Sequence, residues 1–171
     1  MFGAAIFNVT LSSLSMGQST PSFPCRKWIA YYGQDGDCEA LGSYDIVVLD
    51  PAFQGSIQRC QRKGAKVLGY ISLGEISADS ALFLHLDDHS AILSPNREWP
   101  NCFRVDVRNP SWRSLILKKG IPAIIGRGFS GVFFDTLDTP PYLEQTDPLR
   151  FHGMRVAAID LVKSIRRKFP N

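Results

Sequence analysis

The sequence has few of the features that mark a membrane span, a nucleotide site or a zinc site. Its apolar runs stay far below the roughly 20 residues that a membrane-spanning helix needs. No glycine-rich phosphate motif follows an apolar run, and Cys-x-x-Cys and His-Glu-x-x-His motifs are absent. These absences argue against a transmembrane protein, a nucleotide-binding sheet and a zinc ribbon or zinc protease.

Basic residues are absent before Arg26, although residues 2–7 are apolar. A secretory signal normally begins with a basic region, so this segment is a poor match to one. Residues 1–24 are rich in Ser, Gly, Pro and Thr. They are predicted to form a leader or linker, and both a degenerate signal segment and a disordered leader stay open. The folded domain is predicted to cover residues 25–171.

The chain has 171 residues, of which 44% are hydrophobic, enough for one core and one domain. Its net charge of +3 is mild, and basic pairs such as Arg62-Lys63 lie where helices are predicted to end. No nucleic-acid partner is therefore expected. The four cysteines allow disulfides or free thiols, and Cys25 with Cys38 is the easiest pair in sequence.

Short apolar runs alternate with helical patterns along the domain. Strands are predicted at residues 27–32, 44–49, 65–73, 131–134 and, more weakly, 103–107. Helices are predicted at about 55–63, 110–127 and 148–169, and residues 77–102 are expected to form a long loop with a short helix. Asn109 and Pro110 look like a helix N-cap and first turn, whereas Pro140-Pro141 is expected to break the chain. This alternation predicts an α/β fold with a parallel sheet.

The number of strands is too small for a closed eight-stranded barrel, which typically needs about 250 residues. Four to five strand–helix units are present in the predicted order. A half-barrel, an open doubly wound sheet and the front part of a longer product all fit this count.

Four apolar runs end in, or lead straight into, a carboxylate. These carboxylates are Asp50, Glu75, Asp106 and Asp135, the last followed closely by Asp138. Parallel strands place their carboxyl ends on one face of a sheet, which is where barrel enzymes carry their chemistry. The sequence therefore predicts an acidic site at one mouth of the sheet.

Each candidate also has a structural alternative. Asp50 can close a turn before Pro51, and Asp138 can hydrogen-bond back to its own turn. Asp106 can pair with Arg108 or cap the following helix. Tyr70 can stack on a sugar ring or fill the barrel, and Trp112 is expected to pack in the core.

Five blocks of this chain, taken in order, resemble glycoside hydrolase family 114. The blocks are 28–33 (WIAYYG), 47–51 (VVLDP), 69–75 (GYISLGE), 105–113 (VDVRNPSWR) and 128–138 (GFSGVFFDTLD). The resemblance covers about residues 27–169. It implies a partial (β/α)8 TIM barrel and an endo-α-1,4-polygalactosaminidase-like activity. It also implies an extracellular or cell-envelope location, although a cytoplasmic one stays open.

The resemblance assigns roles to particular residues. Asp135 matches the catalytic aspartate, and the residues matching positions around the same mouth are Tyr32, Asp50, Tyr70, Glu75 and Asp138. The family's second essential carboxylate, usually a Glu, belongs to a later strand that is outside this sequence. No cofactor or metal is implied. The expected partner is an amino-sugar polymer, whose ammonium groups clustered carboxylates would attract.

Three other interpretations of the same residues stay open. The chain can be a non-catalytic carbohydrate-binding or scaffold protein that keeps the acidic mouth. It can be a metal-dependent hydrolase that uses the carboxylates and His152. Two half-barrels can also associate, because a half-barrel leaves open sheet edges.

Overall fold

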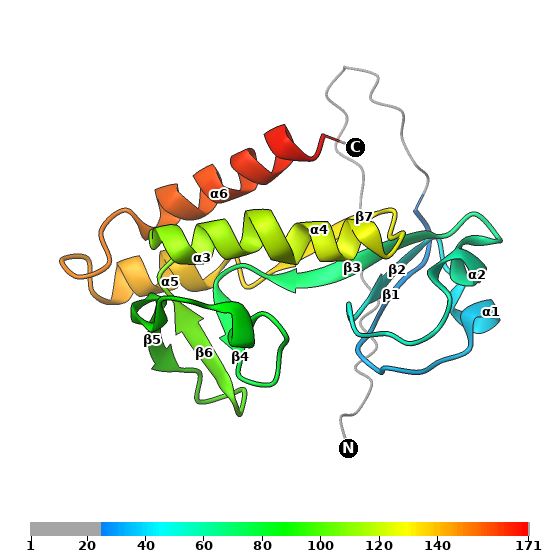
Figure 1. Cartoon of the computed structure of the whole chain (residues 1–171), viewed down its shortest axis with the longest axis horizontal. Helices are drawn as coiled ribbons and strands as arrows, with labels where there is room; N and C mark the ends of the chain where they lie inside the picture. Colours follow the sequence, from blue (N-terminus) through cyan, green and yellow to red (C-terminus); the bar gives the residue numbers. More distant parts are fainter. Residues whose placement is uncertain (1–24, 171) are drawn as a thin grey trace.

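The computed structural model describes residues 25–170, so the predicted leader, residues 1–24, lies outside the described residues. A four-stranded parallel sheet forms the centre of the fold (Figure 1). Its strands, in spatial order, are β1 (Trp28–Tyr31), β2 (Ile46–Leu49), β3 (Lys66–Ser72) and β7 (Gly131–Asp135). The predicted parallel α/β architecture is confirmed, with four strands in the parallel sheet rather than five.

Short helices connect the first three strands. Helix α1 (Cys38–Leu41) follows β1 and α2 (Ile57–Gln61) follows β2. Asp37 and Ser56 cap their amino ends, each accepting a hydrogen bond from a backbone N–H of the first turn. Gly64, with φ of 90°, takes the left-handed conformation in the turn between α2 and β3.

A second sheet is inserted between β3 and the next helix, and it corrects two predictions. Its antiparallel strands, in the order β4-β6-β5, are β4 (Glu75–Ser77), β5 (Ile92–Pro95) and β6 (Cys102–Val105). The weak strand predicted at 103–107 therefore does not join the parallel sheet. Residues 77–102 contain strand β5 and two 3-10 turns, Phe83–His85 and His89–Ala91, instead of one long loop. Strands this short show too few alternations to be recognised from sequence.

The helix predicted at 110–127 forms with an internal irregularity. It comprises α3 (Pro110–Leu115), a π-helical stretch (Ile116–Gly120) and α4 (Ile121–Gly126). Asn109 caps it as predicted, because its side-chain oxygen accepts from the N–H groups of Ser111 and Trp112 at 2.8 and 3.2 Å. The wide π turn ends two residues before Pro122, which has no N–H to donate.

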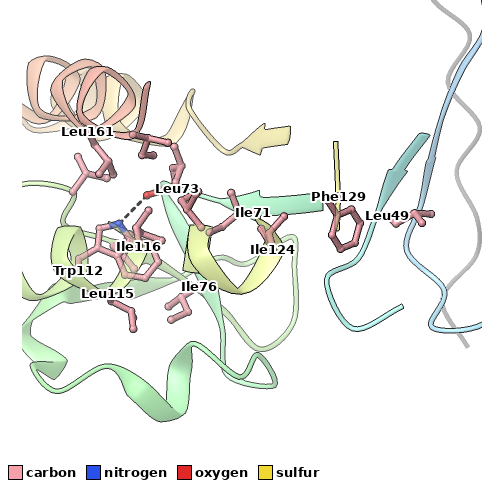
Figure 2. Close-up of a cluster of buried hydrophobic side chains, with 14 of the residues drawn as sticks. Leu49, Ile71, Leu73, Ile76, Trp112, Leu115, Ile116, Ile124, Phe129 and Leu161 are labelled. Atoms are coloured by element: carbon pink, nitrogen blue, oxygen red, sulfur yellow. Dashed lines mark hydrogen bonds between the residues drawn. The ribbon is translucent and has the colours of Figure 1, made fainter. Parts of the chain in front are cut away.

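This long helix packs on the outer face of the parallel sheet. Ile124 lies against Gly69 of β3, and Gly120 lies against Ile71. Trp112 is fully buried, and its indole N–H donates to the Leu73 carbonyl at 3.0 Å (Figure 2). The prediction that Trp112 packs in the core is therefore confirmed.

Two helices follow β7, and they correct the predicted chain break. Pro140 and Pro141 lie in the first turn of α5 (Thr139–Thr146), where a missing N–H costs no helical bond. Helix α6 (Met154–Lys168) starts later than the predicted position 148. It runs along the long helix (Figure 1), and Arg113 donates to the Ala157 carbonyl at 2.8 Å.

The described residues include no membrane-spanning helix, and their cysteines are unbridged. No helix within residues 25–170 has the length and apolar character needed to cross a bilayer. All four cysteines are free thiols, so the Cys25–Cys38 pairing suggested by sequence proximity is not formed. Cys25 is exposed, whereas Cys38 and Cys60 are buried.

Gly74, at the corner between β3 and β4, generates a stability prediction. A Cβ atom here would lie 2.3 Å from the Thr136 carbonyl oxygen, so Gly74→Ala should destabilise the fold by about 1 to 3 kcal/mol. Gly126→Ala is the matched control, because a Cβ there meets nothing within 4 Å. It should be neutral or stabilising by up to about 1 kcal/mol. Urea unfolding of both variants checks the difference, and equal stabilities would contradict the close approach.

Candidate active site

Strand register decides which side chains share the inner face of the sheet. Tyr70 pairs with Phe133 and Ser72 with Asp135, so these side chains project from the same face. The outer face, bearing Gly69 and Ile71, is covered by the long helix. Asp135 is therefore the carboxylate that the parallel sheet places at its carboxyl end, on the face away from that helix.

Asp135 accepts a short hydrogen bond from Tyr70. The Tyr70 hydroxyl lies 2.7 Å from Asp135 Oδ2, and the Tyr70 ring stacks on Phe133. Tyr32 meets the same tyrosine edge to face, with ring centroids 5.3 Å apart. Three predicted site residues, Tyr32, Tyr70 and Asp135, are thus brought together by the structure.

The two tyrosines stay protonated beside this carboxylate. Burial raises the pKa of Tyr70 first, and its hydrogen bond to Asp135 raises the pKa further. Burial also raises the pKa of Tyr32, with a second contribution from the negative charge of Asp135. Tyr70 therefore remains a hydrogen-bond donor to Asp135 well above neutral pH.

Thr136 fixes the backbone directly after Asp135. Its φ of 57° is unusual for a β-branched residue. The Thr136 hydroxyl accepts from the Gly74 N–H at 2.8 Å and lies 2.7 Å from the Ser72 hydroxyl. The Leu73 N–H also donates to the Asp135 carbonyl at 3.1 Å. These bonds lock the ends of β3 and β7 together, and the unusual conformation marks a constrained position.

Glu75 is buried, at 8% exposure, and it is held by neutral donors. Asn96 donates to both carboxylate oxygens at 3.1 and 3.0 Å, and Thr139 donates to Oε1 at 3.0 Å. These donors come from the residue after β5 and from the start of α5. Glu75 therefore joins β4 to two other elements, and its predicted contact with substrate stays a prediction.

Asp50 directly follows β2, and Asp138 lies in the loop between β7 and α5. Asp50 accepts from the Ala52 N–H at 2.6 Å, which closes the turn after β2 as the structural alternative proposed. Asp138 is exposed and precedes α5, and its side chain makes no capping hydrogen bond to that helix. Their roles in substrate binding stay predictions.

Asp106 does not belong to the parallel-sheet mouth, because it follows β6 of the antiparallel sheet. It forms an ion pair with Arg108 at 2.7 Å, and Arg108 also donates to the carbonyls of Arg150 and His152. Burial raises the pKa of Asp106, but the hydrogen bonds from Arg108 lower it more, so the net shift is downward. The structural alternative for Asp106 is confirmed, and the pair fastens the loop between α5 and α6.

Residues 25–170 contain no group of three or more His, Cys, Asp or Glu side chains that could hold a metal ion. His152, the histidine considered for a metal, is exposed. The metal-dependent interpretation therefore has no support from side-chain placement.

Sequence reasoning missed the polar side chains that support the carboxylates. These are Ser72, Asn96, Thr136 and Thr139. Ser72 and Thr136 lie inside the recognised blocks, and Thr139 directly follows the last block, which was the available signal. Asn96 had none, because it reaches Glu75 only through the inserted sheet.

One recess of the described surface lies elsewhere. A cavity of about 310 Å³ is lined by residues 42–45 and 63–65, next to the amino ends of β2 and β3. The carboxylates discussed above lie at the carboxyl ends of the same strands. We assign no chemistry to this cavity, because active sites of parallel barrels lie at the opposite end.

A parallel strand–helix sheet with a carboxylate at a strand's carboxyl end is the arrangement in which barrel enzymes carry their active sites. The family model described as glycoside-hydrolase family GH114 matches residues 14–168, so this chain belongs to that family. The resemblance seen in the sequence blocks is thereby confirmed. Comparison with curated proteins found no match.

Solved structures agree with this assignment. The glycoside hydrolase domain of PelA from Pseudomonas aeruginosa is 25% identical to this chain, with a TM-score of 0.73. The match covers 85% of this chain and 57% of that domain. Aspergillus fumigatus Ega3, solved in complex with galactosamine, has 18% identity and a TM-score of 0.68, covering 88% and 59% of the two chains. This chain therefore spans somewhat more than half the length of these relatives, which agrees with a partial barrel.

Tyr70 generates a prediction about alkaline stability. The unfolded phenol titrates near pH 10, and the folded pKa is higher. The stabilisation from the protonated Tyr70 is therefore fully present below about pH 10 and is lost as pH rises toward the folded pKa. Tyr70→Phe should reduce this alkaline loss, measured by urea unfolding between about pH 9 and pH 11. Tyr142→Phe, at an exposed tyrosine, should keep the wild-type pH dependence.

Glu75 generates a second prediction. In Glu75→Gln, an amide N–H₂ replaces an oxygen that accepts from Asn96, so donor faces donor. The variant should lose about 1 to 3 kcal/mol of unfolding free energy. Glu39→Gln, at an exposed position of α1, should unfold like the wild type. A stable Glu75→Gln would show that Glu75 does not hold the three elements together.

Proposed function

We propose that this chain is a glycosidase domain acting on α-1,4-linked galactosamine polymers, with Asp135 as a catalytic carboxylate. One observation carries the proposal. Asp135 lies at the carboxyl end of a parallel strand, in a GH114 domain, with Tyr70 and Tyr32 around it. Tyrosine rings next to a carboxylate suit a sugar, because they offer both an apolar face and a hydrogen-bonding group.

Asp135 is assigned the role of the carboxylate that attacks or activates water. Glycoside hydrolysis needs one carboxyl group that protonates the leaving oxygen and one carboxylate that attacks or activates water. The Tyr70 hydroxyl donates to Asp135 Oδ2 at 2.7 Å, and this bond holds the carboxylate in place on the inner face of the sheet. The other carboxyl group is assigned to protonate the leaving oxygen.

The second carboxyl group is proposed to come from outside the four described parallel strands. Glu75 is engaged by Asn96 and Thr139, and Asp106 by Arg108. Two sources fit: a further strand of the same barrel, or a second copy of this chain facing the first. In both cases the reaction requires the inner face of the sheet to be completed.

The substrate class is supported by charge. A galactosamine polymer carries ammonium groups. Carboxylates at the carboxyl ends of the parallel strands, with Asp50 after β2 and Asp135 and Asp138 at and after the end of β7, would attract such cations. Ega3, which shares the fold, was solved with galactosamine bound. The proposed substrate also favours an extracellular or cell-envelope location. A long charged polymer does not cross a membrane, so it would not reach a cytoplasmic enzyme.

A non-catalytic carbohydrate-binding role is the second candidate. It is favoured by the engagement of Glu75 and Asp106 in structural bonds, which occupies two of the carboxylates that could have partnered Asp135. In this reading Tyr32, Tyr70 and the carboxylates bind the polymer without cleaving it.

The test compares cleavage and binding of a de-N-acetylated α-1,4-galactosamine oligomer. Asp135→Asn should lower the hydrolysis rate by about 10²- to 10⁴-fold, because it removes the charge that attacks or activates water. Asp160→Asn, on the exposed face of α6, should keep the wild-type rate. Reducing-end release and equilibrium binding are measured on the same preparations.

The concentration dependence separates the candidates. Specific activity that rises with protein concentration supports completion of the site by a second copy. Binding without cleavage at every concentration supports the non-catalytic role. Cleavage that survives Asp135→Asn would contradict the assignment of Asp135.

A further inference from the structure

Two buried cysteines lie where the first two helices meet. Cys38 is the first residue of α1 and is 8% exposed, while Cys60 lies in α2 and is fully buried. The two helices pack side by side at one end of the molecule (Figure 1). Neither residue belongs to the acidic mouth.

Both cysteines converge on one carbonyl oxygen. The Cys38 thiol donates to the Ser56 carbonyl at 3.3 Å, and the backbone N–H of Cys60 donates to the same oxygen at 3.2 Å. Gly42 shows how closely the two backbones approach. A Cβ there would lie 2.7 Å from the Cys60 carbonyl oxygen and 2.9 Å from that of Cys38.

The two cysteines are neighbours across this helix contact. Burial raises the pKa of the Cys60 thiol, and the neighbouring Cys38 side chain raises it further. Two cysteines on helices whose backbones approach this closely need little backbone movement to reach disulfide geometry.

We propose that Cys38 and Cys60 are a disulfide-forming pair that cross-links α1 to α2 in an oxidising environment. The co-reactant is a small-molecule disulfide such as oxidised glutathione. The Cys38 thiolate attacks one of its sulfurs and releases one thiol, and Cys60 then attacks the mixed disulfide and releases the second. The two cysteines lose two protons and two electrons in total, and the glutathione disulfide is reduced to two thiols.

The bridge would enclose the segment that carries Asp50. Residues 38–60 contain β2 and the turn after it, and Phe53 of that turn meets Tyr31 of β1 edge to face. Closing this loop restricts the unfolded chain, so the oxidised protein should be more stable than the reduced one. The bond replaces only the weak hydrogen bond from the Cys38 thiol to Ser56.

The first test is a peptide map of the full chain, equilibrated with oxidised and reduced glutathione and alkylated without reduction. Trypsin cuts after Arg59, so a Cys38–Cys60 bond joins peptide 28–59 to peptide 60–62. We expect this linked pair to form, with the exposed Cys25 alkylated. Free Cys38 and Cys60 in the oxidised, folded sample would overturn the proposal, and so would a bond from either residue to Cys25 or Cys102.

The second test is thermal unfolding of oxidised and reduced samples. The midpoint should rise by about 5 to 10 °C on oxidation, as expected for a loop of this length in a domain of this size. The double variant Cys25→Ser/Cys102→Ser should keep this rise, and Cys38→Ser/Cys60→Ser should lose it. A rise that depends on Cys25 or Cys102 would contradict the assigned pair.

Discussion

The hydroxyl group of Thr136 joins the two strands on which the site depends. It lies between the Gly74 N–H and the Ser72 hydroxyl, and this fixes the turn after β7 in a left-handed conformation. Gly74 is needed because only a residue without a side chain allows the Thr136 carbonyl so close. The same junction directs Asp135 toward Tyr70 on one side and Glu75 toward Thr139 on the other. Two carboxylates with different surroundings therefore depend on one backbone turn.

The carboxylates at the ends of the apolar runs serve different purposes once they are placed in the fold. Asp135 accepts from a tyrosine on the open inner face, which suits a group that reacts. Glu75 is buried among amide and hydroxyl donors, and Asp106 is neutralised by Arg108. A buried carboxylate that meets its hydrogen-bonding needs within the protein adds rigidity. The structure thus separates a candidate reactive carboxylate from those that hold the surrounding loops.

The sequence predicted the parallel strands well, because continuous apolar runs such as residues 46–49 and 131–134 are typical of strands buried in a parallel sheet. Asn109 with Pro110, and the core position of Trp112, followed from equally local rules. The inserted sheet was missed, since β4 has only three residues and its pairing with β6 is set by tertiary contacts. Pro140-Pro141 was misinterpreted because prolines both end helices and begin them. The supporting residues Asn96 and Thr139 are distant from Glu75 in sequence, so no local pattern could have connected them.

Strand β7 lies at the end of the parallel sheet in the described part of the chain, with β3 as its neighbour, and Asp135 is its last residue. The backbone groups on the other side of β7 are available to a further strand. A polypeptide that paired there would extend the barrel wall and complete the surroundings of the carboxylate in one step. The edge of β7 therefore adjoins the candidate site, so a strand that paired with it would also change the surroundings of Asp135.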